Sequence, residues 1–289
     1  MKLRGILPAL VTPLHPGETL NVSSLEHLLN RVYGASVDGV YVCGNTGEGT
    51  LLPATIRKQI AEIAVKGSPA GKAVIVHVGG WSFAESRDLA MHAEKVGAAA
   101  ISALPPVGAS FDELLVYYRE LAALTGLPLL AYYFPASSSS SLSVGQLEQI
   151  CEIPGVAGLK FTDYDLFTLS VLAKSGNVMY NGRDEVLAAG LLLGASGGIG
   201  SLYNLAPGWF VEIFSAANAG RWAEARAQQD QVTAMLRVLL QFPFLPALKR
   251  VLMWQGIECG EALRPRLRLT KQQEAELLKR IEPVLPPQS

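Results

Sequence analysis

The feature that most constrains the fold of this chain is a repeated pattern of a short apolar run, a turn and a helical segment. Because helical segments separate the expected strands, neighbouring strands should pair in parallel. Eight such units within about 200 residues predict a closed (β/α)8 TIM barrel. The expected strands, in chain order, are Gly5–Val11, Gly39–Cys43, Ala73–Val78, Ala98–Ala103, Pro128–Tyr132, Val156–Phe161, Val178–Asn181 and Gly197–Ser201.

An open, doubly wound sheet is the alternative arrangement for alternating strands and helices. Such a sheet usually carries a glycine-rich phosphate-binding turn after an early strand. The nearest candidate is Gly44–Gly49, with the sequence GNTGEG, and it has neither the G-x-G-x-x-G spacing nor a Gly-Lys-Ser/Thr ending. The sequence therefore favours the closed barrel.

The chain carries more helical segments than a barrel needs. They follow the last expected strand, and they are Trp209–Asn218, Arg221–Gln241, Leu245–Trp254 and Lys271–Ile281. We therefore expect a barrel over residues 1–220 and a C-terminal helical extension over residues 221–289 that packs on it. The run Ser137–Ser141 predicts a mobile polar loop.

Composition excludes several classes of function. The formal net charge is −1, so the chain lacks the basic character that binds nucleic acid or an anionic membrane. No apolar run reaches the length of a membrane span, and the N-terminus lacks a signal-peptide pattern. The 3 cysteines and 4 histidines show no disulfide or metal-ligand spacing, so we expect structural histidines, no metal site and a cytoplasmic location.

Lys160 is the strongest candidate for a catalytic residue. It lies near the end of the apolar strand Val156–Phe161, where a lysine must reach solvent, form an ion pair or perform chemistry. Burial disfavours the ammonium form and lowers the pKa of a lysine towards neutrality. A neutral amine attacks carbonyl carbon to form a Schiff base. A solvated or salt-bridged lysine is the structural alternative.

Polar residues follow the other expected strands, and the carboxyl ends of barrel strands form the active site in this architecture. Asn45 and Thr46 lie in a tight turn whose N–H groups suit a carboxylate. Tyr132 ends the fifth strand, where a phenol can relay a proton near an imine. The later strands contribute Thr162, Gly182, Asp184, Glu185 and Ser201. Together these strand ends predict a single site.

Several motifs extend this prediction to a known family. They are Leu7–Pro13, Gly44–Glu48, Tyr132–Pro135, Gly158–Thr162, Tyr180–Glu185, Gly197–Asn204 and Ala247–Leu252. In order and spacing the chain resembles, over nearly its whole length, the N-acetylneuraminate lyase / dihydrodipicolinate synthase family. Members of this family are class I aldolases that form a Schiff base with pyruvate.

The resemblance implies a role for each site residue. Lys160 would form the imine with the 2-oxo carbon, and Tyr132 would move the proton of the hydroxyl beside the breaking C–C bond. Asn45 and Thr46 would hold the substrate carboxylate. The positions that would grip the polyol tail in the lyase branch are Thr162, Gly182, Asp184, Glu185 and Ser201. The resemblance also implies no cofactor and a homo-oligomer, most often a tetramer built as a dimer of dimers.

The lyase branch fits the motifs better than the synthase branch. Asp184 and Glu185 suit hydroxyl groups and would repel an acidic tail. The synthase branch usually has an arginine where this chain has Ser137, and it has a tyrosine after the fourth strand where this chain has none. Three departures from the lyase pattern are Asn45, where serine or threonine is commoner, Arg183, where bacterial lyases often have tyrosine, and the run Ser137–Ser141, which replaces a more apolar segment next to the site.

The leading hypothesis from the sequence is cleavage of N-acetylneuraminate to pyruvate and N-acetylmannosamine. Alternatives with the same imine are aldol or dehydratase chemistry on 2-keto-3-deoxygluconate or 4-hydroxy-2-oxoglutarate, and dihydrodipicolinate synthesis. An alternative of another class is a catalytically inactive paralogue that binds sugar acids, which the intact Lys160, Tyr132 and Thr46 disfavour.

Overall fold

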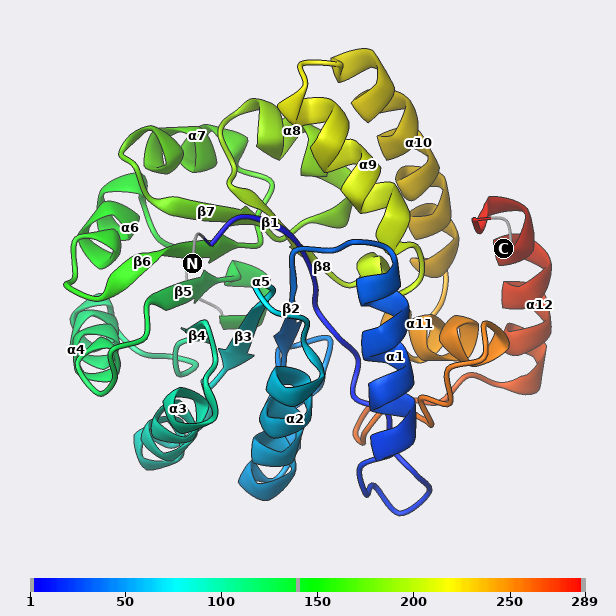
Figure 1. Ribbon diagram of the computed structural model, residues 1–289, viewed down its shortest axis with the longest axis horizontal. Helices are drawn as coiled ribbons and strands as arrows, with labels where there is room; N and C mark the ends of the chain where they lie inside the picture. The colour runs from blue at the N-terminus through cyan, green and yellow to red at the C-terminus, as the bar shows by residue number, and fades with distance from the viewer. Residues whose placement is uncertain (1–2, 139–140, 287–289) are drawn as a thin grey trace.

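A parallel β-barrel forms the centre of the molecule in the computed structural model, which describes residues 3–138 and 141–286 (Figure 1). Within these residues, eight parallel strands follow the order β1-β8-β7-β6-β5-β4-β3-β2. An isolated parallel bridge between Ala9 and Tyr41 joins the first strand to the second and closes the ring. The predicted TIM barrel is therefore confirmed. The strands are β1 Gly5–Pro8, β2 Gly39–Val42, β3 Ala73–His77, β4 Ala100–Ala103, β5 Leu129–Tyr133, β6 Val156–Phe161, β7 Val178–Asn181 and β8 Gly197–Gly200.

The strand limits differ from the sequence prediction by more than one residue at two places, the end of β1 and the start of β4. Beyond Pro8 the chain leaves the regular ladder, because Ala9 donates to Gly200 while Leu10 donates to Tyr41 on the other side. The fourth strand begins at Ala100 rather than Ala98, because the Ala98 N–H is taken by Ala93 at the end of the preceding helix. Local hydrogen bonding, which apolar patterning does not record, sets both limits.

Helices alternate with the strands and surround the barrel. They are α1 Val22–Gly34, α2 Ala54–Gly67, α3 Phe83–Val96, α4 Phe111–Ala122, α5 Pro135–Ser138, α6 Val144–Cys151, α7 Leu166–Lys174, α8 Leu187–Leu192 and α9 Pro207–Asn218, with short 3₁₀ turns η1 Gly49–Leu51, η2 Asp184–Val186 and η3 Leu202–Asn204. The expected polar loop Ser137–Ser141 falls partly on α5, which ends at Ser138, while Ser139 and Ser140 lie outside the described residues.

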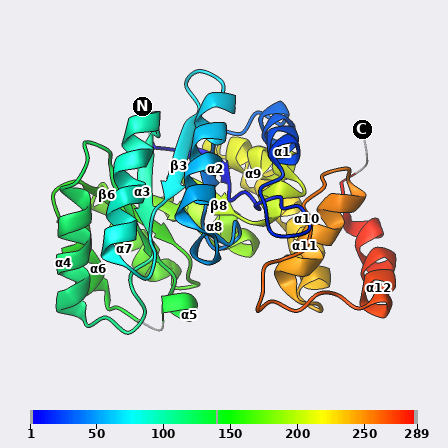
Figure 2. The same ribbon diagram turned by 90° about the horizontal axis from the view of Figure 1, so that it is seen from below.

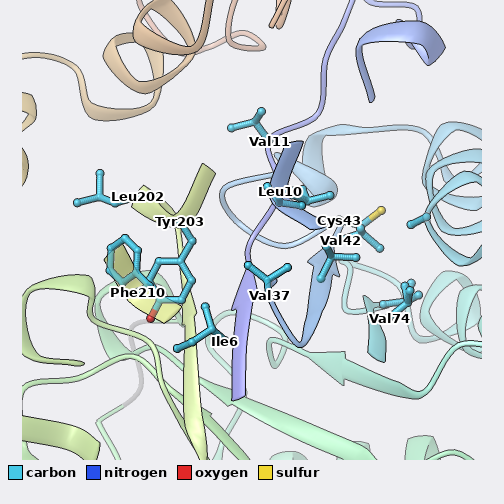
Figure 3. Close-up of a cluster of buried hydrophobic side chains, with 14 of the residues drawn as sticks. Ile6, Leu10, Val11, Val37, Val42, Cys43, Val74, Leu202, Tyr203 and Phe210 are labelled. Carbon is cyan, nitrogen blue, oxygen red and sulfur yellow. The ribbon is translucent and has the colours of Figure 1, made fainter. Parts of the chain in front are cut away.

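Alternation along the strands separates two hydrophobic cores. In β1, Leu7 packs inside the barrel with Tyr41 and Ile75, whereas Ile6 faces the surrounding helices. Figure 3 shows part of the outer core, in which Ile6 lies near Tyr203 and Phe210. Full burial of each such aliphatic side chain contributes about 1.5–3 kcal/mol, which holds the helices against the strands.

Up to residue 286, where the described chain ends, three further helices form the C-terminal extension: α10 Trp222–Leu239, α11 Phe244–Trp254 and α12 Lys271–Ile281, followed by the turn η4 Glu282–Val284. Figure 2 shows them on one side of the barrel, away from α3 and α4. Helix α10 packs along α9 and against η2, which follows β7. The expected division at residue 220 lies in the turn between α9 and α10, and we keep it as a proposal.

The described residues contain no single helix that is long and apolar enough to cross a membrane. Helices α10 and α11 pass that test of length and composition only as a pair, and the pair is bent by 111°.

Candidate active site

Lys160 projects from β6 into the carboxyl end of the barrel. On its two sides it pairs with Tyr132 of β5 and Tyr180 of β7, and its side chain is 3% exposed. The Nζ atom lies 4.0 Å from the centre of the Tyr41 ring and 4.1 Å from that of the Tyr132 ring. The amine therefore lies between two aromatic faces.

The electrostatics of Lys160 suit a nucleophile. Burial lowers its pKa from 10.5 to about 7, and the nearby Asp184 carboxylate partly opposes this change. At neutral pH, a large fraction of the protein molecules therefore carry Lys160 as a free amine. The two aromatic faces attract a cation, so they would also stabilise the positive charge of a protonated imine. The structure therefore places Lys160 away from solvent, and not in the solvated position that was the structural alternative.

Tyr132 and His77 form the adjoining wall. The Tyr132 ring meets the His77 ring edge-on at 6.0 Å and stacks on Phe134. Burial raises the pKa of Tyr132, while Thr162 and then Arg183 oppose the rise. Burial also lowers the pKa of His77 well below its usual range, and its Nε2 accepts a hydrogen bond from the Leu104 N–H at 3.0 Å. Both side chains are therefore uncharged near neutral pH.

The chain turns tightly after β2. The N–H of Glu48 donates to Asn45 at 3.1 Å, and Gly49 donates to Gly44 at 3.0 Å. A side chain at Gly44 would place Cβ 2.4 Å from the Tyr41 ring, so only glycine fits the turn here. From the other side, the Thr12 hydroxyl donates to the Gly47 carbonyl at 2.6 Å.

Ser201 lies next to Thr46, although the resemblance gives the two residues different parts of the substrate. The two hydroxyl oxygens are 2.6 Å apart, which joins the end of β8 to the turn after β2. The resemblance assigns Ser201 to the tail of the substrate and Thr46 to its carboxylate. The observed contact brings Ser201 to the end of the site that holds the Asn45–Thr46 turn.

Asp184 and Glu185 lie at the start of η2 in different surroundings. Asp184 is 7% exposed, and its Oδ2 accepts a hydrogen bond from the Leu202 N–H at 2.8 Å. Burial raises the pKa of Asp184 from 3.8 to about 7, although the hydrogen bond from Leu202 opposes the rise. Gly200 makes room for this carboxyl group, since a Cβ there would lie 1.7 Å from Asp184 Oδ1. Glu185 instead accepts a hydrogen bond from the Tyr164 hydroxyl near the surface.

Gly182 and Arg183, which precede Asp184, also line the site. The Arg183 guanidinium lies 4.4 Å from the centre of the Tyr164 ring and 5.4 Å from that of Phe134. Gly182 packs against Thr162, and a Cβ at this glycine would come within 2.0 Å of the Thr162 hydroxyl. A side chain at position 182 would therefore displace Thr162.

A cavity of about 230 Å³ opens among these groups. All the site residues predicted from the sequence line it: Asn45, Thr46, Tyr132, Lys160, Thr162, Gly182, Asp184, Glu185 and Ser201. The cavity and a few polar groups that converge in it have the form of a small-molecule site. Within residues 3–138 and 141–286, no cluster of histidine, cysteine, aspartate or glutamate has the arrangement of a metal site.

Sequence reasoning missed two kinds of residue at this site. Tyr41 and His77 belong to strands β2 and β3, and the rule that strand ends form the site would have found His77. Leu236, Leu240 and Phe244 line the cavity from the extension. No local pattern could have found these three, because their position depends on how α10 and α11 pack against the barrel.

Comparison with known proteins agrees with the residue pattern. Residues 2–283 match the profile of the Dihydrodipicolinate synthetase family. An N-acetylneuraminate lyase of Rhizobium meliloti (strain 1021) is 34% identical over 99% of this chain and 96% of its own length. The structure of CdNal from Clostridium difficile in complex with mannosamine has a TM-score of 0.93 at 26% identity, covering 99% of this chain and 100% of the other. YagE of Escherichia coli K12 in complex with pyruvate has a TM-score of 0.92 at 25% identity, covering 98% of each chain.

Proposed function

The chain belongs to the dihydrodipicolinate synthetase family of Schiff-base carbon–carbon lyases, and we propose that it cleaves N-acetylneuraminate to pyruvate and N-acetylmannosamine. The observation that carries the proposal is the Lys160 amine, buried in the cavity with a pKa of about 7. The similarity to N-acetylneuraminate lyases supports the choice of substrate.

In the proposed reaction, the Lys160 amine attacks the 2-oxo carbon of the substrate and water leaves. The protonated imine then withdraws electrons, so that the C3–C4 bond breaks as the C4 hydroxyl loses its proton and becomes an aldehyde. The remaining enamine takes up a proton at C3, and hydrolysis of the imine releases pyruvate and restores the amine. Tyr132 is the proposed relay for the C4 hydroxyl proton, because its raised pKa keeps the phenol protonated between transfers.

Binding of the substrate divides the site into two ends. Asn45 and Thr46 are proposed to hold the carboxylate through the N–H groups of their turn and the Thr46 hydroxyl. Ser201 supports this end through its hydrogen bond with Thr46. The proposed contacts of the polyol tail are Thr162, Gly182, Asp184 and Glu185, which also line the cavity.

Other substrates would use the same imine. They are 2-keto-3-deoxygluconate, 4-hydroxy-2-oxoglutarate and the aldehyde substrate of dihydrodipicolinate synthase. A catalytically inactive sugar-acid-binding protein is the alternative of another class, and the buried Lys160 amine argues against it. A cytoplasmic location and a homotetramer built as a dimer of dimers stay predictions of the sequence.

The proposal is tested by measuring pyruvate release, coupled to lactate dehydrogenase, from N-acetylneuraminate and 2-keto-3-deoxygluconate side by side. Lys160→Ala is the blank. Borohydride reduction in the presence of pyruvate should add the pyruvate-derived mass to Lys160 in the wild type and nothing to the variant. A clear preference for N-acetylneuraminate supports the lyase assignment. A preference for 2-keto-3-deoxygluconate would reject N-acetylneuraminate as the substrate but would still be consistent with imine formation at Lys160. The absence of a trapped mass in the wild type would reject imine formation itself.

A further inference from the structure

Glu48 is a buried acidic residue that the proposed reaction does not use. Glu48 directly follows Gly44–Gly47 and is 1% exposed. Its Oε2 accepts a hydrogen bond from Lys249 Nζ at 2.8 Å, and its Oε1 accepts one from the Leu263 N–H at 2.7 Å. Arg266 Nε lies 3.5 Å from the same Oε1. One carboxylate therefore joins the turn after β2 to three residues beyond the barrel.

Lys249 carries this connection into the C-terminal extension. It lies on α11, is 1% exposed, and also donates to the Glu261 carbonyl at 3.0 Å. The connection therefore runs from the turn after β2 to α11 and to the segment around residues 261–263. The sequence motifs Gly44–Glu48 and Ala247–Leu252, about 200 residues apart, meet at this ion pair.

The backbone at Glu48 adopts a conformation that is uncommon for a residue with a side chain. Its φ angle is 55°, in the left-handed region that favours glycine, although the position holds a glutamate. Burying two charges is also a weak source of stability, since an apolar pair of similar size often folds equally well. The hydrogen bonds of Glu48 instead hold the turn after β2 in one orientation, because each carboxylate oxygen has its own donor.

We propose that Glu48 is a positioning residue, which through Lys249 and Leu263 holds the Asn45–Thr46 turn in the orientation that receives the substrate carboxylate. The C-terminal extension thereby sets the affinity for the pyruvyl half of the substrate, in addition to lining the cavity. This inference rests on the proposed function, in which that turn binds the carboxylate.

The test compares variants by the pyruvate concentration that gives half-maximal borohydride trapping at Lys160, and by kcat and KM for the cleaved acid. Glu48→Leu/Lys249→Met removes both charges of the buried pair together, so neither is left without its partner, while Arg266 has a side chain that is 36% exposed. We expect half-saturation to rise about tenfold, the size of one lost charge-assisted hydrogen bond. The kcat at saturating substrate should stay within about threefold of the wild-type value, since the amine and the proton relay are intact.

Two controls separate positioning from general stability. Glu48→Gln/Lys249→Gln keeps donors and acceptors without charge, and it should restore half-saturation towards the wild-type value. Arg250→Met removes the neighbouring ion pairs of α11 with Glu261 and Glu274, each at 2.9 Å, and should leave half-saturation unchanged. Thermal unfolding of each variant records stability separately.

The inference is overturned if the folded Glu48→Leu/Lys249→Met protein binds pyruvate as the wild type does, or if Arg250→Met raises half-saturation equally. Should the apolar pair fail to fold, Glu48→Asp keeps the charge but shortens its reach by one methylene. The same rise is then expected, and its absence overturns the inference. A wild-type protein that traps no pyruvate would refute the proposed function, and this inference with it.

Discussion

The pH dependence of imine formation at Lys160 is the sharpest test of the site. With a pKa of about 7, about half of the side chains carry a free amine at pH 7. An ordinary lysine with a pKa of 10.5 would have only about three free amines in ten thousand at that pH. At pH 7, burial therefore increases the reactive form about a thousandfold.

The assay measures the rate at which cyanoborohydride, which survives this pH range, traps the imine with saturating pyruvate between pH 5.5 and 9.5. Intact-protein mass detects the covalent adduct. The rate should rise with pH and level off above a midpoint near 7, since deprotonation is then complete. Asp184→Asn should move the midpoint down, because the Asp184 carboxylate raises the pKa of Lys160. A trapping rate that keeps rising tenfold per unit through pH 9 would refute the argument from burial.

The same pKa also predicts how stability changes with pH. Because the pKa of Lys160 is lower in the folded chain than in the unfolded chain, the unfolded chain binds more protons between about pH 7 and pH 10.5. The free energy of unfolding should therefore increase, through the titration of Lys160, as pH rises through that window. Lys160→Met should stabilise the protein at pH 7, and the gain should shrink towards pH 10, as urea unfolding at each pH would show. A gain independent of pH would contradict the assignment.

Three further substitutions test separate parts of the site. Tyr132→Phe should slow pyruvate release about 10²–10⁴-fold in the coupled assay while borohydride trapping of pyruvate persists, and unchanged turnover would remove the phenol from the proton path. Gly182→Ala should displace Thr162, because the new Cβ would lie 2.0 Å from its hydroxyl, and KM for the sugar acid should therefore rise. An unchanged KM would show that Thr162 can move without affecting substrate binding. Ser201→Ala removes the 2.6 Å contact with Thr46 and should raise the half-saturating pyruvate concentration up to about tenfold without changing the ranking of substrates, whereas a changed ranking would return Ser201 to the tail.

Local sequence determined the barrel because each unit carries its own signals. Apolar runs of strand length, such as Ala73–His77, alternate with amphipathic helices such as Phe111–Ala122, and parallel pairing follows from their order. The rule that strand ends meet at one face then predicts from the sequence alone that Lys160, Tyr132 and Thr46 lie together. All of the site residues predicted in this way line one cavity.

Tertiary packing decided which residues from distant parts of the sequence meet, and how completely they are buried. The amine environment of Lys160 depends on Tyr41, which comes from a strand on the other side of the barrel, and the Glu48–Lys249 pair joins residues about 200 positions apart. The pairing of Ser201 with Thr46 likewise depends on ring closure. The pKa values of Lys160 and Asp184 follow from how completely other elements exclude water from them. Periodicity reports which face of an element is apolar, but only the folded chain determines which distant groups meet there and how much solvent remains.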